Sequence, residues 1–207
     1  MINGKLIKVC GMTDGENIRS VEALGVDIIG FIFHRGSPRC VHKVPDYLPV
    51  KAKRAGVFVN AAPEEILRFN ETFRFDYVQL HGDESPEFCD QLRMKEGLKV
   101  IKAFGIAKET VRDTVAGYEG SCDFFLFDTR TRLYGGSGKS FDWSLIDGYE
   151  EKTPFLLSGG IGPDTVEVLR GFRHPLLAGI DLNSRFETAP GIKDPQLLKT
   201  FINKLQY

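Results

Sequence analysis

The chain has 207 residues, the length of one ordinary domain or at most two small ones. Its composition, 42% hydrophobic and 27% charged, is that of a soluble globular protein. The net charge of −1 gives no sign of the basic face that nucleic-acid binding needs, so we expect no nucleic-acid partner.

Short apolar runs recur along the whole chain and alternate with segments that carry helix signals. The runs predict eight strands, at residues 6–10, 27–33, 54–59, 76–80, 98–104, 122–128, 154–158 and 176–182. Capping residues or prolines predict six helical segments, at 14–24, from 63, from 85, 110–118, from 163 and from 194. The segments after the second and sixth strands are weaker, because Pro45 and Pro49 interrupt the first and only 143–149 is left for the second.

The alternation of strands and helices predicts an α/β protein, a single domain over residues 1–207. Strands that are continuously apolar are buried on both faces, as parallel strands are. A doubly wound open sheet and a (β/α)8 barrel both fit. Eight units in about 200 residues favour a small (β/α)8 TIM barrel. The first strand is not followed by G-x-G-x-x-G, which weakens the dinucleotide-binding alternative.

The cysteines and the apolar runs bear on metal sites and location. None of Cys10, Cys40, Cys89 and Cys122 forms a C-x-x-C motif or has a histidine at metal-site spacing, so we expect no metal and no disulfide framework. Residues 1–8 lack the apolar core of a signal peptide, and no run is long enough to cross a bilayer. We therefore expect a cytoplasmic protein without a membrane partner. No self-complementary apolar stripe is evident, which favours a monomer.

A barrel places its chemistry at the carboxyl ends of the strands and in the loops that follow them. Gly159 and Gly160, at the seventh end, precede a helix start at Pro163, so backbone N–H groups there can approach a phosphate. The alternative is that these glycines only make a tight turn. Polar residues and glycines also mark the other ends, among them Cys10, His34, Asn60, Gln79, His81, Asp128, Asp181, Asn183 and Ser184.

Cys10 ends the first strand and Asp128 ends the sixth. In a closed barrel both side chains can point into one mouth. A thiolate is a competent base and a carboxylic acid a competent proton donor when their pKa values are tuned. The pair suits a reaction that moves a proton within one substrate, although each residue considered alone is better explained as structural.

The segment 129–142 is longer than a normal strand-to-helix loop. Its three glycines in four positions predict a mobile lid. Residues 137–140 resemble half of a P-loop, but the first glycine stands four rather than six residues before Lys139, which excludes that motif.

Together, several short motifs carry a resemblance to a known family. They are KVCGMT at 8–13, GFIF at 30–33, SPR at 37–39, GVFVN at 56–60, VQLHGDE at 78–84, IKAF at 101–104, FDT at 127–129, YGGSGKSFDW at 134–143, LSGGI at 157–161, DLNSRFE at 181–187 and PGIKD at 190–194. In this order, over essentially the whole chain, they resemble the phosphoribosylanthranilate isomerases of tryptophan biosynthesis.

The resemblance implies a ribulose-phosphate-binding barrel that needs neither a metal nor an organic cofactor. It implies an Amadori rearrangement of N-(5-phosphoribosyl)anthranilate to 1-(2-carboxyphenylamino)-1-deoxyribulose 5-phosphate. Asp128 would be the general acid that protonates the ring oxygen, and Cys10 the general base that takes the proton from C2′ of the sugar.

The resemblance also implies binding roles. Arg39 would lie near the anthranilate carboxylate, and Gln79 and His81 would line the pocket. Asp181 would either contact the sugar hydroxyls or only orient the pocket. Backbone groups around four residues would hold the phosphate: Gly159, Gly160, Asn183 and Ser184. Arg185 stands where a common family pattern has glycine, so it either adopts the same backbone angles or rearranges the loop, and its cation could also help to bind the phosphate.

Two alternatives stay open. One is another isomerase, epimerase or lyase that acts on a phosphorylated sugar in the same class of barrel, because fold alone does not decide function. The other is a protein that binds a phosphorylated sugar without catalysis. Side activity on a histidine-pathway aminoaldose is also compatible with the residues, since that rearrangement is chemically the same.

Overall fold

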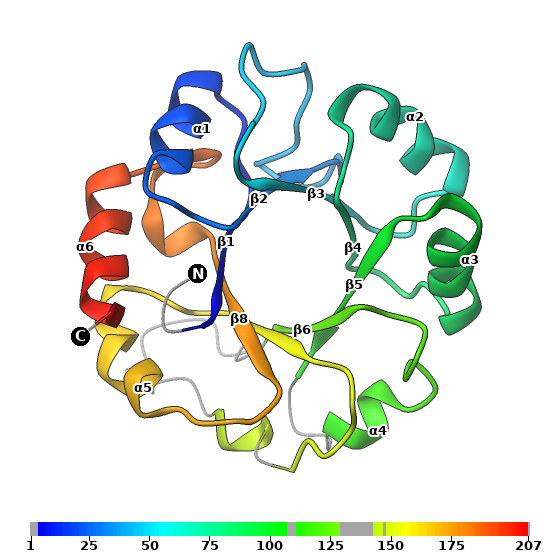
Figure 1. Cartoon of the computed structure of the whole chain (residues 1–207). Coiled ribbons are helices and arrows are strands. Elements are labelled where there is room, and N and C mark those ends of the chain that lie inside the picture. The colour runs from blue at the N-terminus through cyan, green and yellow to red at the C-terminus, as the bar shows by residue number, and fades with distance from the viewer. Residues whose placement is uncertain (1–3, 107–110, 129–142, 147, 207) are drawn as a thin grey trace.

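The computed structural model describes residues 4–106, 111–128, 143–146 and 148–206. Eight parallel strands close into a barrel in chain order, with helices around the outside (Figure 1). The predicted (β/α)8 barrel is therefore confirmed. The strands are β1 (Leu6–Val9), β2 (Ile28–Ile32), β3 (Lys53–Phe58), β4 (Tyr77–Leu80), β5 (Lys99–Gly105), β6 (Phe124–Asp128), β7 (Phe155–Ser158) and β8 (Leu177–Leu182).

The helices begin largely where capping residues predict. Asp14 accepts a hydrogen bond from the backbone N–H of Asn17, and Ser85 accepts one from that of Phe88, so both side chains cap the helices that follow. The helices are α1 (Gly15–Glu22), α2 (Pro63–Phe73), α3 (Pro86–Glu96), α4 (Val111–Val115), α5 (Val166–Gly171) and α6 (Pro195–Gln206). None of these helices, in the part of the chain that is described, is long and apolar enough to span a membrane.

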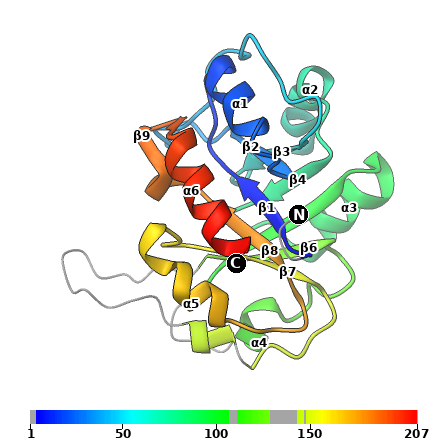
Figure 2. The same ribbon diagram turned by 60° about the vertical axis from the view of Figure 1, so that its left-hand side comes forward.

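Short 3-10 turns replace or extend helices at three places. They are η1 (Trp143–Ile146), η2 (Pro163–Thr165) and η3 (Ser184–Phe186). After β8 the chain also forms a small antiparallel hairpin of β9 (Glu187–Ala189) and β10 (Ile192–Lys193), which the sequence did not predict (Figure 2). This hairpin brings Glu187 and Lys193 to the carboxyl end of the barrel.

The weaker helical segment expected after the second strand is absent, so that expectation is wrong. Residues 33–52 are all described and contain no helix, and the segment loops outward between α1 and α2 (Figure 1). Pro45 and Pro49 lack the backbone N–H that a helix interior needs, which explains the loss.

Glu22, in the last turn of α1, holds this irregular segment in place. Its Oε1 accepts the backbone N–H groups of Val50, Lys51 and Ala52 at 2.7–2.9 Å, and Tyr47 donates its hydroxyl to Oε2. Although burial opposes ionisation, these donors lower the pKa of Glu22 below its ordinary value. One carboxylate therefore takes the place of the missing helical hydrogen bonds.

The barrel interior is apolar at one end and polar at the other. A cluster of Ile101, Ala103, Leu126 and Leu156 fills the part nearer the amino ends of the strands. The buried polar side chains come from inward-facing strand positions nearer the carboxyl ends, and they include Lys8, Gln79, Asp128 and Asp181. Buried polar groups need partners. The polar side chains at the carboxyl ends of the strands therefore need an explanation beyond packing.

We predict that Glu22→Ala lowers the free energy of unfolding by about 2–4 kcal/mol, because three backbone N–H groups, one of them buried, lose their acceptor. Since the folded pKa of Glu22 is depressed, its contribution is full above the unfolded value and is lost as the pH falls below it. Urea unfolding at pH 7 and pH 3 measures both effects. Glu16→Ala, at an exposed position of the same helix, is the control. Equal losses in the two variants would contradict this role.

Candidate active site

A cavity of about 710 Å³ opens at the carboxyl ends of the strands. Its lining comes from β2, β3, β4, β6, β7 and β8 and from loops at the carboxyl ends of the strands, including the one after β1. All the site residues expected from the sequence line this cavity: Cys10, Arg39, Gln79, His81, Asp128, Gly159, Gly160, Asp181, Asn183 and Ser184. The barrel thus gathers side chains that are up to 174 positions apart in the chain.

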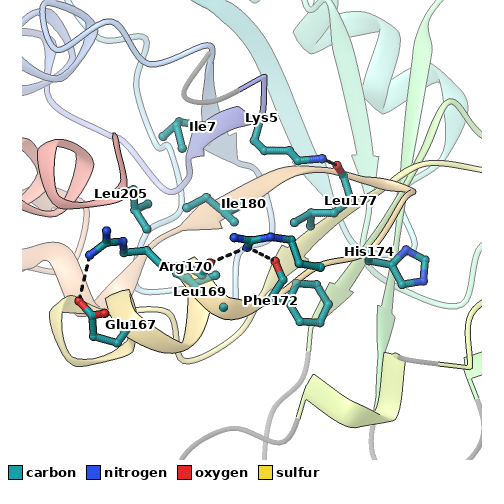
Figure 3. A pocket seen from close by; sticks show the side chains of 12 residues that line it. Lys5, Ile7, Glu167, Leu169, Arg170, Phe172, His174, Leu177, Ile180 and Leu205 are labelled. Carbon is teal, nitrogen blue, oxygen red and sulfur yellow. Dashed lines mark hydrogen bonds and ion pairs between the residues drawn. The ribbon is translucent and has the colours of Figure 1, made fainter. Parts of the chain in front are cut away.

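A second cavity, of about 810 Å³, lies between α5, α6 and the amino ends of β1 and β8 (Figure 3). Its cations have partners within the protein: Lys5 Nζ donates to Leu177 O at 2.5 Å, Arg173 Nη1 donates to Phe172 O at 3.0 Å, and Arg170 Nη1 lies 3.4 Å from Glu167 Oε1. Although it is larger, it lies at the end of the barrel that supports stability rather than chemistry. We therefore place the active site in the cavity at the carboxyl ends.

Cys10 lies just after β1, and its side chain is on the same inward face as Lys8 two residues earlier. The residue is 3% exposed. A β-carbon on Gly30 would stand 2.8 Å from the Cys10 sulfur, so the glycine in β2 makes the room for the thiol. Burial raises the pKa of the Cys10 thiol above its ordinary value, and the positive charge of Lys8 only partly offsets this.

Lys8 and Asp181 form a buried ion pair beneath Cys10. Lys8 Nζ lies 2.8 Å from Asp181 Oδ1, and neither side chain is more than 6% exposed. Burial alone would lower the pKa of Lys8, but Asp181 and Cys10 raise it above its ordinary value, so Lys8 stays charged. Ser158 donates its hydroxyl to the second oxygen of Asp181 at 3.4 Å. Both oxygens of Asp181 therefore have partners within the protein, Lys8 and Ser158.

Asp128 ends β6 with its side chain 8% exposed and faces His81, whose Nε2 lies 3.7 Å from Asp128 Oδ2. On the other side of the imidazole, Gln79 Nε2 lies 3.3 Å from His81 Nδ1. When Gln79 donates to Nδ1, the proton of a neutral imidazole is on Nε2, the nitrogen that faces Asp128. The imidazole of His81 therefore lies between Gln79 and the Asp128 carboxyl group.

The loop that carries His81 is fixed from behind by Glu84. This carboxylate accepts the backbone N–H groups of Asn60 at 2.8 Å and Gly82 at 2.9 Å. Lys102, on the outward face of β5, lies 3.1 Å from it and donates to Gly82 O at 2.6 Å. The loops after β3 and β4 are therefore tied together directly beside the cavity.

Arg39 comes from the irregular segment after β2 and makes a bidentate ion pair with Glu187. The distances are 2.8 Å for Nε to Oε1 and 2.6 Å for Nη2 to Oε2. Glu187 also lies 2.5 Å from Nζ of Lys193, which donates to Asn183 Oδ1 at 2.7 Å. Hydrogen bonding to Glu187 raises the pKa of Arg39. Gly11, at φ +77°, leaves space for this network, since its β-carbon would stand 2.8 Å from Arg39 Cδ and 3.0 Å from Asn183 Oδ1.

The candidate phosphate site lies between the ends of β7 and β8. Gly159 and Gly160 have φ angles of +84° and +66°, which side chains rarely adopt, so glycine is required in this turn. Arg185 does not take a left-handed conformation; it sits in η3. Its side chain crosses Gly162, and Nη2 lies 2.7 Å from Asp164 Oδ1. The loop therefore accommodates an arginine with ordinary backbone angles.

Sequence reasoning missed four residues that contact the predicted set: Lys8, Ser158, Glu187 and Lys193. Lys8 had a local signal, because a lysine two positions before Cys10 in an apolar strand must share its face. Glu187 and Lys193 lie in two of the motifs that carry the family resemblance, but no local pattern placed them in the site, since the hairpin was not predicted. The 129–142 segment and Lys139 lie outside the described residues. In the ranges that are described, no three His, Cys, Asp or Glu side chains are placed to hold a metal ion.

Comparisons with known proteins agree with this geometry. Residues 7–204 match the model of the family described as N-(5'-phosphoribosyl)anthranilate (PRA) isomerase. An N-(5'-phosphoribosyl)anthranilate isomerase of Parabacteroides distasonis is 52% identical, over 97% of this chain and 93% of its own.

Two solved structures are similar along nearly their whole length. The phosphoribosyl anthranilate isomerase of Thermotoga maritima is 36% identical, covers 98% of both chains and has a TM-score of 0.83. A phosphoribosyl anthranilate isomerase in complex with reduced 1-(o-carboxyphenylamino)-1-deoxyribulose 5-phosphate is 32% identical, covers 98% of both chains and has a TM-score of 0.81. Sequence, fold and site geometry agree, and the chain belongs to the phosphoribosylanthranilate isomerase family of tryptophan-biosynthesis enzymes.

Proposed function

We propose that this chain converts N-(5-phosphoribosyl)anthranilate to 1-(2-carboxyphenylamino)-1-deoxyribulose 5-phosphate by general acid and general base catalysis. The observation that carries the proposal is the presence of Cys10 and Asp128, a thiol and a carboxyl group, in one cavity with Arg39 and the Gly159–Gly160 turn. A substrate with a carboxylate, a sugar ring and a phosphate needs a group for each of these parts.

Asp128 acts first, as the acid. It gives its proton to the furanose ring oxygen, the bond from C1′ to that oxygen breaks, and the nitrogen lone pair forms a cationic Schiff base. His81, at 3.7 Å, supports the carboxylate that remains. Because Asp128 is buried beside this imidazole, the proton donor is held in one orientation, which general acid catalysis requires.

Cys10 then acts as the base. Its thiolate removes the proton from C2′, and the electrons of that C–H bond neutralise the Schiff base to give an enolamine. The enolamine tautomerises to the ketone as O2′ loses a proton and C1′ gains one, so the overall change is an isomerisation. The positive Schiff base favours the thiolate at this stage, against the burial that raises the pKa of Cys10 in the free chain.

The remaining lining residues bind and orient. Arg39 suits the planar anthranilate carboxylate. Backbone N–H groups at Gly159, Gly160, Asn183 and Ser184 suit the phosphate. Asp181 works through Lys8: its Oδ1 lies 2.8 Å from Lys8 Nζ and holds the lysine beneath the thiol.

We predict that Cys10→Ala and Asp128→Asn each lower kcat by at least about 10³-fold while product affinity changes little, because each removes one proton-transfer group. The assay follows loss of substrate fluorescence, coupled to indole-glycerol-phosphate synthase because the substrate also decays spontaneously. Cys89→Ala, in α3, is the control cysteine. A folded parent that shows no turnover would favour the alternatives, a different phosphosugar enzyme or a non-catalytic binder.

We predict that Cys10 in the free protein ionises above the ordinary thiol value of about 8.5, because it is buried. Its alkylation by iodoacetamide, followed by mass spectrometry of the Cys10 peptide, should therefore keep accelerating past that pH. Lys8→Met should move the midpoint further upward, since a nearby positive charge that lowers the pKa of Cys10 is lost. Lys5→Met, at the other end of the barrel, should not. A midpoint below the ordinary value would contradict this account.

We predict that Arg185→Ala raises KM about three- to tenfold and changes kcat less than twofold, since a partly exposed guanidinium adds only modest phosphate binding. Steady-state kinetics measures both parameters. Arg170→Ala, an arginine in α5 far from the cavity, is the control. A fall in kcat at constant KM would show that Arg185 acts on the chemical step instead.

A further inference from the structure

Glu187 occupies only one edge of the Arg39 guanidinium. It binds the side formed by Nε and Nη2, at 2.8 and 2.6 Å. A guanidinium has five N–H donors in a planar fork. The end formed by Nη1 and the second Nη2 proton makes no hydrogen bond to any described residue. Because Arg39 lines the cavity, that end can accept a second carboxylate in the same plane.

The charges around Glu187 are unequal. One carboxylate, 5% exposed, lies against two cations, Arg39 at 2.6 Å and the fully buried Lys193 at 2.5 Å. Burial opposes ionisation of Glu187, but hydrogen bonds from Arg39 and Lys193 lower its pKa below the ordinary value. The cluster of these three residues therefore carries one net positive charge, which a ligand with a single carboxylate would neutralise.

The position of Glu187 is itself fixed. The backbone N–H of Gly191, in the hairpin turn, donates to Oε1 at 3.2 Å. Lys193 connects the same oxygen to Asn183, in the loop after β8, through distances of 2.5 and 2.7 Å. Arg39 comes from a segment without a helix, so its direction depends on this partner rather than on its own backbone.

We propose that Glu187 is a positioning residue that makes the site selective for a substrate with a carboxylate on its aromatic ring. Glu187 binds the Nε and Nη2 side of the Arg39 guanidinium. The N–H groups at its Nη1 end therefore face the substrate before it binds. The inference rests on the proposed function for the identity of the ligand, and it adds the residue that determines selectivity for that carboxylate. Preorganisation of this kind contributes affinity because the ordering cost is met on folding.

The test compares two unreactive ligands, the reduced product 1-(2-carboxyphenylamino)-1-deoxyribitol 5-phosphate and the same compound without the carboxylate. Titration calorimetry gives both dissociation constants and hence their ratio. We expect the parent to prefer the carboxylated ligand by roughly 10- to 100-fold, as for a hydrogen-bonded charge pair. Glu187→Gln should reduce this preference about tenfold and leave the affinity for the other ligand nearly unchanged.

A second variant separates orientation from charge. Glu187→Gln/Lys193→Met removes one negative and one positive group, so the net charge of the cluster, Arg39 included, stays at +1. The preference should fall in this variant too if orientation is what matters. An unchanged ratio in both variants would overturn the proposal, and so would a parallel loss of affinity for both ligands, which a collapsed pocket would cause. Glu187→Asp, which keeps the charge, should retain part of the preference.

Turnover is measured separately on the same proteins. A parent that binds both ligands with the expected ratio but does not isomerise the substrate would contradict the proposed function and leave the role of Glu187 intact. A parent that is active but shows no carboxylate preference would contradict the role of Glu187 alone.

Discussion

The buried ion pair of Lys8 and Asp181 lies at the seam where the first strand of the barrel meets the last. The two residues are direct partners in the register of β1 and β8, and their charged atoms are 2.8 Å apart. An ion pair in such a place is rarely the most stabilising choice, because two apolar side chains of similar volume avoid the desolvation cost. The site explains its presence better than stability does, since Cys10 lies directly above Lys8 on the same face of β1.

The same balance of charge extends through the mouth of the barrel. Cys10 is influenced by three cations, Lys8, Lys193 and Arg39, and two carboxylates balance them, Asp181 and Glu187. The excess of one positive charge lies where a thiolate and a carboxylated ligand would meet. A buried site of this kind binds an anion at little reorganisation cost, because its charges are already held by their partners.

Glycines and an irregular segment make this arrangement possible. Gly30 leaves the volume that the Cys10 sulfur fills, and Gly11 leaves the volume for Arg39. Between β2 and β3 the chain forms a loop instead of a helix. Glu22 fixes this loop by accepting hydrogen bonds from three of the loop's backbone N–H groups. Arg39, in the same segment, makes its ion pair with Glu187 at 2.6 Å.

The sequence by itself determined the parts that depend on neighbours along the chain. The apolar runs predicted all eight strands, and Asp14 and Ser85 predicted two helix starts, because strand patterning and capping act over a few residues. Because the parallel strands of a barrel all have their carboxyl ends on one side, the sequence also predicted that Cys10, Asp128 and the other strand-end candidates lie in one site.

Only the tertiary structure decided which side chains pair inside that mouth. Lys8 and Asp181 are 173 positions apart, and Arg39 and Glu187 are 148 apart. Barrel closure and strand register bring such residues together, and neither is encoded in a local pattern. The hairpin that carries Glu187 and Lys193 has the same origin, since contacts with distant residues outweigh local propensity there. The missing helix between β2 and β3 has a local cause instead, because Pro45 and Pro49 interrupt that segment.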